Sequence, residues 1–504
     1  MVSVSAQSRS LRPIQTNSGL ISGVTGSNGV TAFLGVPFAK APVGELRWRP
    51  PQPPAPWQGV RRADHFGASC MQPRIASLLP WTEEFMTQGE LSEDCLFLNV
   101  WTAAQPGEKQ AVMVFIHGGG FGGGSGSIAV YNGARLAEKG VVIVTVNYRV
   151  GVLGFLVHPE LTRESEHHSS GNYGLLDQIA ALEWIRDNIA AFGGDPTQVT
   201  IFGQSAGAMS VTCLMRSPLA QGLFARAIAQ STPENFMPPG KDSILGSTNI
   251  QEREQDGVKY AGKKGAHSLA ELRKLPAEEF YRSTGFISDF RGGPVYDGWV
   301  LSEKHPQHEV PLMTGIVAGD VNMVDGFGPQ PQPTVAWFED SAREKFGNSA
   351  PEFLKLYPVK QDSNVPTVKQ ASREDEGRVS VDLWSAEQLK HSPAVYTYFF
   401  DRAIPWPAHP EFGAFHTAEV PYIFRNLRSM DRPWQPVDEK LSETISSYWV
   451  NFAKTGDPSG PGLAKWPAYN PAQHVTMELG ERTGPMPNAA PERLRFLLNF
   501  ADKH

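Results

Sequence analysis

Short apolar runs rich in β-branched residues recur through the first half of the chain. Three of them are AVMVFI (111–116), VVIVTVNY (141–148) and QVTIF (198–202). Runs of this length and composition are typical of strands buried on both faces of a parallel sheet. The sequence therefore predicts at least three neighbouring strands in this part of the chain.

A helical pattern separates the second and third of these runs, in GNYGLLDQIAALEWIRDNIAAFGGDP (171–196). Apolar residues recur at steps of three and four, which places them on one face of a helix: Leu175, Ile179, Leu182, Ile185 and Ile189. Gly193 and Gly194 should end the helix, and Pro196 follows them. A strand, a helix and a strand form a crossover unit, so we expect the α/β class.

The region from about 235 to 390 is less regular. It combines loops rich in Pro and Gly, such as FGPQPQPTV (327–335), with weaker helical patterns, such as SLAELRKLPAEEFYRST (268–284). No linker composition separates this region from the rest. We therefore expect a single domain over residues 1–504, with a helical insertion at about 235–390 that lies over the sheet.

Composition and charge narrow the function classes. The net charge of -7 over 504 residues provides no basic face for a nucleic acid. The longest apolar runs are too short to span a bilayer. The first residues, MVSVSAQSRSLRPIQTN, lack the apolar stretch of a secretory signal. The three cysteines, Cys70, Cys95 and Cys213, have no metal-ligand spacing, but one bridge with one leftover thiol is possible.

The stretch VTIFGQSAGAMSV (199–211) contains the first candidate for chemistry. A strand ending at Phe202 must turn at once into a helix beginning near Ala206, with Ser205 at the corner. The turn predicts strained backbone at Ser205 and no room for side chains at Gly203 and Gly207. The helix N-terminus behind the serine suits a developing oxyanion. The alternative is an ordinary turn from a strand to a helix.

A run of glycines, HGGGFGGGSGS (117–127), directly follows the AVMVFI strand. Glycines let backbone N–H groups approach a ligand closely, and an acyl-transfer enzyme needs such donors for its tetrahedral oxyanion. We expect the N–H groups of Gly119, Gly120 and Ala206 to form this oxyanion hole. The alternative is a flexible loop. We interpret His117 as a structural member of the loop.

A serine nucleophile needs a base and an orienting acid, and on this fold both follow the serine along the chain. Several further motifs occur in order: FLGVPFAKAPVGELRWRPP (33–51), SEDCLFLNVW (92–101), HGGGF (117–121), VTVNYRVGVLGFL (144–156), the helical stretch at 171–196 and GQSAG (203–207). Together they resemble the type-B carboxylesterase family, which includes cholinesterases and bacterial p-nitrobenzyl esterases. The resemblance covers nearly the whole chain and implies an α/β-hydrolase fold, with a mostly parallel central sheet flanked by helices and helical insertions over the active site.

The resemblance also implies where the base lies. Family members place it in a Gly-x-x-His segment that is followed by an acidic residue and an apolar run. GAFHTAEVPYIF (413–424) matches this pattern, so His416 is the expected base. His409 lies nearby without that context, and a surface histidine is the alternative for His416. Glu419 resembles the supporting carboxylate of this segment.

The acid is expected in PLMTGIVAGDVNMVDG (311–326). The family usually has a Gly, four residues, and then a Glu that is followed by Gly. Counting from Gly315 places Asp320 at the acid position, with Val321 in place of the usual Gly. An Asp is shorter by one methylene group, so the loop must bring it closer to the base. Asp325 is the fallback, and either residue could instead belong to a turn.

The resemblance implies three further pairs of residues. Cys70 is paired with Cys95, while Cys213 stays outside the bridge. A disulfide implies an oxidising compartment, so we expect a secreted or periplasmic protein whose leader is absent from this sequence, with a cytoplasmic location as the alternative. The expected structural ion pairs are Arg47 with Glu93 and Arg149 with Asp177. Ser231 occupies a position where relatives have Ser-Gly, and Thr232 replaces that Gly.

Aromatic residues of two segments are candidates for the substrate pocket: Trp81 and Phe85 in the 70–95 loop, Phe286 and Phe290 in GFISDFRGG (285–293), together with Phe121 of the glycine run. They favour a bulky apolar acyl or alcohol group, and ordinary core aromatics are the alternative. Trp81 lies farther from Cys95 than the cation-binding Trp of cholinesterases lies from its cysteine. We therefore do not predict a choline-ester specialist.

These observations predict a serine carboxylesterase that forms an acyl-enzyme through a triad of Ser205, His416 and Asp320. The partner is a small-molecule ester, with no nucleic acid, no membrane span, no cofactor and no metal. Cleavage of amides, thioesters or lactones by the same triad is one alternative. A catalytically silent relative used for binding or adhesion is another. The sequence does not decide between a monomer and a weak dimer.

Overall fold

The computed structural model describes residues 13–75, 77–105, 107–232, 249–281, 290, 292–302, 307–325 and 333–501, with the backbone alone at 323–325. The chain forms two compact units. Unit 1 consists of Met1–Ala229, Gly240–Val310 and Val420–Pro458, and unit 2 of Gln230–Pro239, Pro311–Glu419 and Ser459–His504. The expectation of one domain over residues 1–504 stays a prediction.

The strands of unit 1 belong to a main sheet and two small sheets. They are β1 (Ile14–Thr16), β2 (Gly19–Ser22), β3 (Val24–Thr25), β4 (Thr31–Pro37), β5 (Val60–Arg62), β6 (Ser69–Cys70), β7 (Leu91–Ser92), β8 (Phe97–Thr102), β9 (Gln110–Ile116), β10 (Val142–Val146), β11 (Gly194–Gln204) and β12 (Arg226–Gln230). The main sheet of this unit has the order β12-β11-β9-β10-β8-β4-β3. Strands β10, β9 and β11 are parallel, whereas β8, β4 and β3 pair antiparallel at one side.

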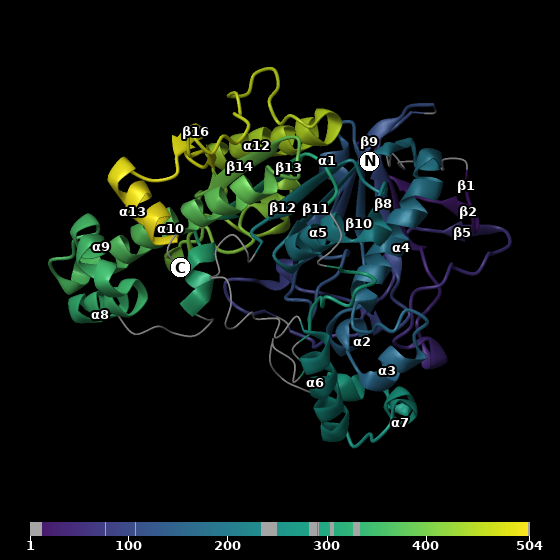
Figure 1. Cartoon of the computed structure of the whole chain (residues 1–504). Helices are drawn as coiled ribbons and strands as arrows, with labels where there is room; N and C mark the ends of the chain where they lie inside the picture. Colours follow the sequence, from purple (N-terminus) through teal and green to yellow (C-terminus); the bar gives the residue numbers. More distant parts are fainter. Residues whose placement is uncertain are drawn as a thin grey trace. The chain divides into compact units, whose positions relative to one another are not determined.

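Figure 1 shows helices packed around these strands. Those of unit 1 are α1 (Ala134–Ala137), α2 (Gly151–Phe155), α3 (Pro159–Glu164), α4 (Tyr173–Asn188), α5 (Ala206–Arg216), α6 (Ile250–Lys263), α7 (Leu269–Lys274), α11 (Val420–Ile423) and α12 (Pro436–Thr455). The chain passes from β10 through α2, α3 and α4 to β11. This is the expected crossover unit, because β10 and β11 both run parallel to β9.

The three strands expected from the apolar runs are confirmed as β9, β10 and β11, which are fully buried over most of their length. The expected bounds differ from the observed ones, mainly for β11, which begins at Gly194 and extends to Gln204. In the register, Gly203 of β11 lies opposite Ile116 of β9. Because parallel strands end at the same edge, the glycine run after β9 and the serine corner after β11 meet there.

Helix α4 is confirmed, and it ends through a short 3₁₀ turn at Gly193, whose φ of 79° is left-handed. The expected face is buried, but the opposite side is buried as well, including Asp177 and Gln178. Asp177 tolerates burial because Arg149 binds both of its carboxylate oxygens. The apolar pattern therefore identified the helix but underestimated how completely the protein encloses it.

Unit 2 also combines strands and helices. Its elements are β13 (Leu312–Val317), the 3₁₀ turn η8 (Asp320–Asp325), α8 (Val335–Phe346), α9 (Ala350–Leu356), α10 (Val365–Gln388), β14 (Val395–Phe400), β15 (Val475–Leu479), β16 (Thr483–Pro487) and α13 (Pro491–Ala501). Strands β13, β14 and β15 are parallel, and β16 pairs antiparallel with β15. Aromatic side chains of α8, α9 and α13 pack in one cluster with residues of α10.

The described part of residues 235–390 contains α6 to α10 but also β13, so this region is not purely helical. Mostly parallel strands flanked by helices confirm the expected α/β class. Among the described residues, no helix is long and apolar enough to cross a membrane.

Candidate active site

Ser205 lies at the corner between β11 and α5 in unit 1. Its φ of 58° and ψ of −124° are unfavourable for a residue with a side chain. The residues on either side of it are buried, whereas Ser205 is partly exposed. The turn from strand to helix at Ser205 is thus strained and partly exposed, in line with the strained corner that the sequence predicted.

The two glycines beside Ser205 are required by close backbone contacts. A Cβ atom at Gly203 would lie 2.5 Å from the carbonyl oxygen of Gly207. A Cβ atom at Gly207 would lie 2.1 Å from the carbonyl oxygen of Ile116 in β9. Any side chain at either position would push the corner away from the sheet, which confirms the expected reason for both glycines.

The glycine run lies directly against this corner. A Cβ atom at Gly118 would be 2.6 Å from the carbonyl oxygen of Gln204 and 3.2 Å from Cβ of Ser205. Gly119 and Gly120 then adopt positive φ angles of 107° and 59°. Within the described part of the chain, the N–H groups of Gly119, Gly120 and Ala206 donate to no other group.

His117 is enclosed by the protein and does not act as a surface base. Burial lowers its pKa to about 4, so the ring is neutral at pH 7. Its Nδ1–H donates to the carbonyl oxygen of Gly118 at 2.9 Å, and the ring stacks on Tyr148 at 4.3 Å between centroids. The Tyr148 hydroxyl donates to the carbonyl oxygen of His117 at 2.8 Å. These contacts support the structural role expected for His117.

The expected base and acid lie side by side in unit 2. Nδ1 of His416 is 2.5 Å from Oδ1 of Asp320, and both side chains are buried. The other carboxylate oxygen of Asp320 accepts the backbone N–H of Val317 at 2.9 Å. A carboxylate on Nδ1 selects the tautomer whose Nε2 is unprotonated, which is the form that accepts a proton from a nucleophile. The side chain of Asp325, the fallback acid, lies outside the described residues.

Two glycines allow the shorter acid to reach His416. A Cβ atom at Gly319 would lie 2.5 Å from the carbonyl oxygen of Ala414, so the acid loop approaches the histidine segment through a bare backbone. On the other side, a Cβ atom at Gly377 of α10 would lie 2.7 Å from Cγ1 of Val321. Gly377 therefore makes room for the valine that departs from the family pattern.

Glu419 is a second buried carboxyl group near this pair. Burial first, and then the charge of Asp320, raise its pKa to about 7. Nε2 of Gln230 donates to its Oε1 at 3.3 Å. Ser231, next to Gln230, is buried with a positive φ of 52°, and its N–H donates to the carbonyl oxygen of Gly315. The left-handed backbone therefore lies at Ser231 itself, and Thr232, which stands where relatives have glycine, has no positive φ.

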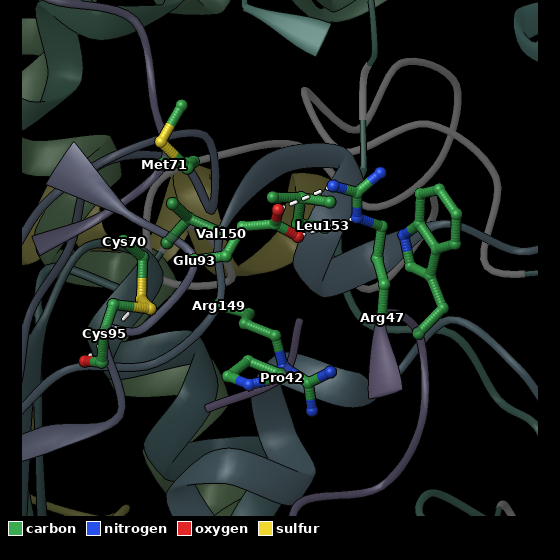
Figure 2. Close-up of a pocket in the computed structure, with 10 residues that line it drawn as sticks. Pro42, Arg47, Cys70, Met71, Glu93, Cys95, Arg149, Val150 and Leu153 are labelled. Carbon is green, nitrogen blue, oxygen red and sulfur yellow. Dashed lines mark hydrogen bonds and ion pairs between the residues drawn. A yellow bond between two sulfur atoms is a disulfide. The ribbon is translucent and has the colours of Figure 1, made fainter. Parts of the chain in front are cut away.

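The disulfide and both ion pairs that the resemblance implied are confirmed. Cys70 is bonded to Cys95, and Cys213 forms no disulfide. Arg47 binds Glu93 at 2.6 Å, and Arg149 binds Asp177 at 2.7 Å. Figure 2 shows the first pair beside the disulfide, around a cavity of about 10 Å³. That volume is about one water molecule, so this cavity is too small for a substrate.

Four of the five aromatic pocket candidates are described, and all four are buried: Trp81, Phe85, Phe121 and Phe290. Phe121 packs edge-to-face on Phe155, and Phe290 packs in the same way on Tyr260. Phe286 lies outside the described residues. Their role as pocket walls stays a prediction.

The sequence analysis missed two side chains that shape this site. Tyr148 supports His117, and Gln72 binds the backbone of Gly124 at the far end of the glycine loop. Gln72 is 52 residues from Gly124 along the chain, so no local pattern connects them. Within the described residues, no group of three or more His, Cys, Asp or Glu side chains is arranged to hold a metal ion.

Comparison with known proteins identifies the family of the chain. The model of the carboxylesterase family matches residues 11–496. The chain is 36% identical to the fumonisin B1 esterase of Sphingopyxis macrogoltabida, over 93% of this chain and 86% of that protein. It is 35% identical to the para-nitrobenzyl esterase of Bacillus subtilis (92% and 94%) and 33% identical to the human cocaine esterase (94% and 89%). The chain belongs to the carboxylesterase family of type B and is a carboxylic ester hydrolase.

Proposed function

We propose that the protein hydrolyses esters through a covalent acyl-enzyme on Ser205. His416 takes the hydroxyl proton of Ser205 as Oγ attacks the ester carbonyl carbon. Asp320 holds the His416 ring and stabilises the imidazolium that forms. The tetrahedral oxyanion accepts hydrogen bonds from the N–H groups of Gly119, Gly120 and Ala206. His416 then returns its proton to the leaving alcohol, and water hydrolyses the acyl-enzyme by the same sequence of steps.

The observation that carries this proposal is the strained corner at Ser205. A non-glycine residue with φ of 58° is costly, and here two flanking glycines that tolerate no side chain maintain it. The corner places the serine against a loop whose N–H groups at Gly119 and Gly120 have no partner within the described residues. A hydroxyl beside unpaired N–H donors is the arrangement that acyl transfer requires.

The first experiment compares Ser205→Ala with the wild type on p-nitrophenyl esters. We expect kcat to fall by about 10⁴- to 10⁶-fold and the initial burst of p-nitrophenol to disappear. Ser217→Ala is the matched control, because this buried serine follows the opposite end of the same helix. It should keep kcat within about twofold. Burst kinetics that survive in Ser205→Ala would refute the acyl-enzyme on this residue.

Variants of His416 and Asp320 test the proposed base and acid separately. His416→Gln should lower kcat about as much as Ser205→Ala, and Asp320→Asn should lower it by about 10⁴-fold through the wrong tautomer. Because the three groups act as a unit, the double variant Ser205→Ala/His416→Gln should be no slower than either single variant. Multiplicative losses would show that His416 acts independently of Ser205.

For the substrate class we propose esters with a bulky apolar acyl or alcohol group. The support is the set of aromatic side chains at Trp81, Phe85 and Phe290. We expect kcat/KM to rise from the acetate to longer p-nitrophenyl esters, and Phe290→Ala to lower it for the longer esters alone. An equal loss for the acetate would indicate a core residue instead. The amide and thioester analogues of one ester, assayed in parallel, would rank the alternative leaving groups.

We also propose that the protein works in an oxidising compartment, outside the cytoplasm. The Cys70–Cys95 bridge supports this, since cytoplasmic reductants keep most thiols reduced. Alkylation of the protein from its native source under denaturing conditions should label one cysteine before reduction and three after it. Labelling of all three without a reductant would contradict the proposal.

A further inference from the structure

The glycine run after β9 has little of its own to hold its shape. Six of the seven residues from 118 to 124 are glycines. Glycine has the largest conformational freedom of any residue and no side chain that packs. Phe121 is the exception: it is fully buried, and its carbonyl oxygen accepts the N–H of Gly151 at 2.6 Å. The rest of the run needs contacts from outside if its N–H groups are to keep one geometry.

Gly124 closes this loop onto its own beginning. Its φ is 113°, and a Cβ atom there would lie 2.3 Å from Nδ1 of His117 and 2.5 Å from the carbonyl oxygen of Gly118. The N–H groups of Gly122 and Gly123 donate to the carbonyl oxygen of Gly119 within the turn. A displacement of Gly124 would therefore be transmitted to Gly118 and Gly119, where the loop contacts Ser205.

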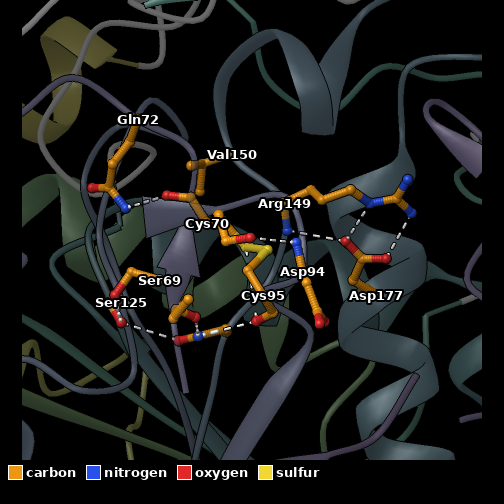
Figure 3. The surroundings of a disulfide bond; sticks show 12 residues. Ser69, Cys70, Gln72, Asp94, Cys95, Ser125, Arg149, Val150 and Asp177 are labelled. Atoms are coloured by element: carbon orange, nitrogen blue, oxygen red, sulfur yellow. Dashed lines mark hydrogen bonds and ion pairs between the residues drawn. A yellow bond between two sulfur atoms is a disulfide. The ribbon is translucent and has the colours of Figure 1, made fainter. Parts of the chain in front are cut away.

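Gln72 holds Gly124 from both sides of its backbone. The Gly124 N–H donates to Oε1 of Gln72 at 2.8 Å, and Nε2 of Gln72 donates to the Gly124 carbonyl oxygen at 2.9 Å. The same Nε2 donates to the carbonyl oxygen of Cys70 at 2.9 Å, an interaction visible in Figure 3. The Gln72 side chain is buried, so water does not compete for these bonds. One carboxamide thus joins the loop to the disulfide.

A second amide holds the next residues of the loop to the other cysteine. Oδ1 of Asn147 accepts the N–H of Gly126 at 2.9 Å, and Nδ2 donates to the carbonyl oxygen of Cys95 at 3.1 Å. Asn147 Oδ1 also accepts the hydroxyl of Ser125 at 3.1 Å. The two half-cystines are therefore each connected through one amide side chain to the same glycine loop, at Gly124 and at Gly126.

We propose that Gln72 is a positioning residue for the oxyanion hole, which keeps the N–H groups of Gly119 and Gly120 aimed at the reacting carbonyl. This inference rests on the proposed function, because it concerns the donors of that oxyanion hole. Gln72 acts through Gly124 and does not itself contact the ester. Its loss should therefore weaken binding of the transition state and leave binding of the substrate almost unchanged.

The test is Gln72→Met, which keeps the length of the side chain and removes all three hydrogen bonds. We expect kcat to fall by about 10- to 100-fold, with KM within about twofold, because a small displacement of oxyanion donors costs this much. The inhibition constant of a trifluoromethyl ketone, which forms a tetrahedral adduct, should rise by the same factor as kcat falls. A residue that serves only the fold would not produce this parallel.

Asn172 supplies the matched control. Its buried amide also binds both backbone groups of one residue, with the Val295 N–H donating at 3.0 Å and the Val295 carbonyl oxygen accepting at 2.7 Å. Asn172→Leu removes two hydrogen bonds of the same kind away from the glycine loop, against the three that Gln72→Met removes. It should lower Tm about as much as Gln72→Met while kcat per folded molecule and the inhibition constant change by less than about twofold.

The outcomes separate the inference from the proposed function. If Ser205→Ala stays active, the proposed function fails and Gln72 is not at issue. If Ser205→Ala is inactive but Gln72→Met keeps the wild-type kcat and inhibition constant, the inference alone is overturned. Gln72→Glu, which keeps the acceptor for the Gly124 N–H, serves if the Met variant does not fold. Failure of both variants to fold would make Gln72 a residue of the fold and would also overturn the inference.

Discussion

At the scale of single residues, Glu419 is a buried acid whose charge is disfavoured mainly by burial. Its side chain is 1% exposed, and among the described residues its Oε2 has no hydrogen-bond partner. Gln230 donates one bond to Oε1. Burial, followed by repulsion from Asp320, raises the pKa to about 7 from the ordinary value of 4.5. The protonated form is therefore the one that the fold prefers.

This pKa predicts how stability depends on pH. Between 4.5 and about 7 the folded protein keeps a proton on Glu419 that the unfolded chain releases. Protonated Glu419 therefore adds to the free energy of unfolding. This added stability is fully present below the pKa of the unfolded chain and is lost as the pH rises through the pKa of the folded protein. The Glu419→Gln side chain is neutral at every pH, so this variant should lose less stability than the wild type as the pH rises. Urea unfolding at about pH 5 and about pH 8 measures it, and identical changes in the free energy of unfolding for both proteins would contradict the prediction.

At the scale of elements, helix α10 determines how the acid loop after β13 is seated. A Cβ atom at Gly377 would lie 2.7 Å from Val321 and 2.8 Å from Cδ1 of Ile316 in β13. Val321 adjoins Asp320, so pressure on the valine reaches the carboxylate that holds His416. A glycine inside a helix normally costs about 0.5–1 kcal/mol relative to alanine, and here the contact explains why it is needed.

We therefore expect Gly377→Ala to lower kcat by about tenfold and to destabilise the protein by about 1–3 kcal/mol through crowding. The double variant Gly377→Ala/Val321→Ala should recover part of the activity, because it removes the Val321 methyl group that collides while the contact with Cδ1 of Ile316 stays. Gly262→Ala in α6 is the control, since apart from its own helix no atom of the described residues lies within 4 Å of its Cβ position. It should be stabilising by about 0.5–1 kcal/mol without a change in kcat. An active and more stable Gly377→Ala enzyme would disprove the steric account.

At the scale of the whole molecule, one covalent crosslink joins residues that are 25 positions apart. A disulfide stabilises mainly by restricting the unfolded chain, and a loop of this size contributes about 3 kcal/mol. The double variant Cys70→Ser/Cys95→Ser should lose about 2–4 kcal/mol in urea unfolding. Cys213→Ser, outside the bridge, should lose less than about 1 kcal/mol. Equal losses for both would mean that the bridge adds no stability beyond burial of the sulfur atoms.

Much of the architecture could be read from local pattern. The β-branched runs identified β9, β10 and β11 because buried parallel strands need apolar residues on both faces. The same pattern could not show that α4 is enclosed on its polar side, because the pairing of Asp177 with Arg149 spans 28 residues. Burial of a charge depends on its partner, and it was the family resemblance, not the apolar pattern, that indicated Arg149 as the partner of Asp177.

The residues of the candidate site also differ in how far the sequence identified them. Ser205 was identified from its own neighbours, because two glycines and a change from strand to helix are all that the corner needs. His416 and Asp320 are 96 residues apart, and only the family resemblance paired them before the folded chain did. Gln72 had no signal at all, since an isolated glutamine after a cysteine carries no pattern. Gly377 likewise became meaningful only beside Val321.

The sequence by itself determined the α/β class, the strand and helix that form the serine corner and the family, because periodicity, glycine placement and ordered motifs are local properties of the chain. The tertiary structure showed that Asp320 meets His416, as the family resemblance implied, and it alone decided which helix glycine admits Val321 and which amide holds Gly124. The hydrogen bond between Gln72 and Gly124 joins residues 52 positions apart, and the one between His416 and Asp320 joins residues 96 positions apart. The energies of these contacts depend on the distance between the atoms and on their burial, and a local sequence pattern determines neither quantity.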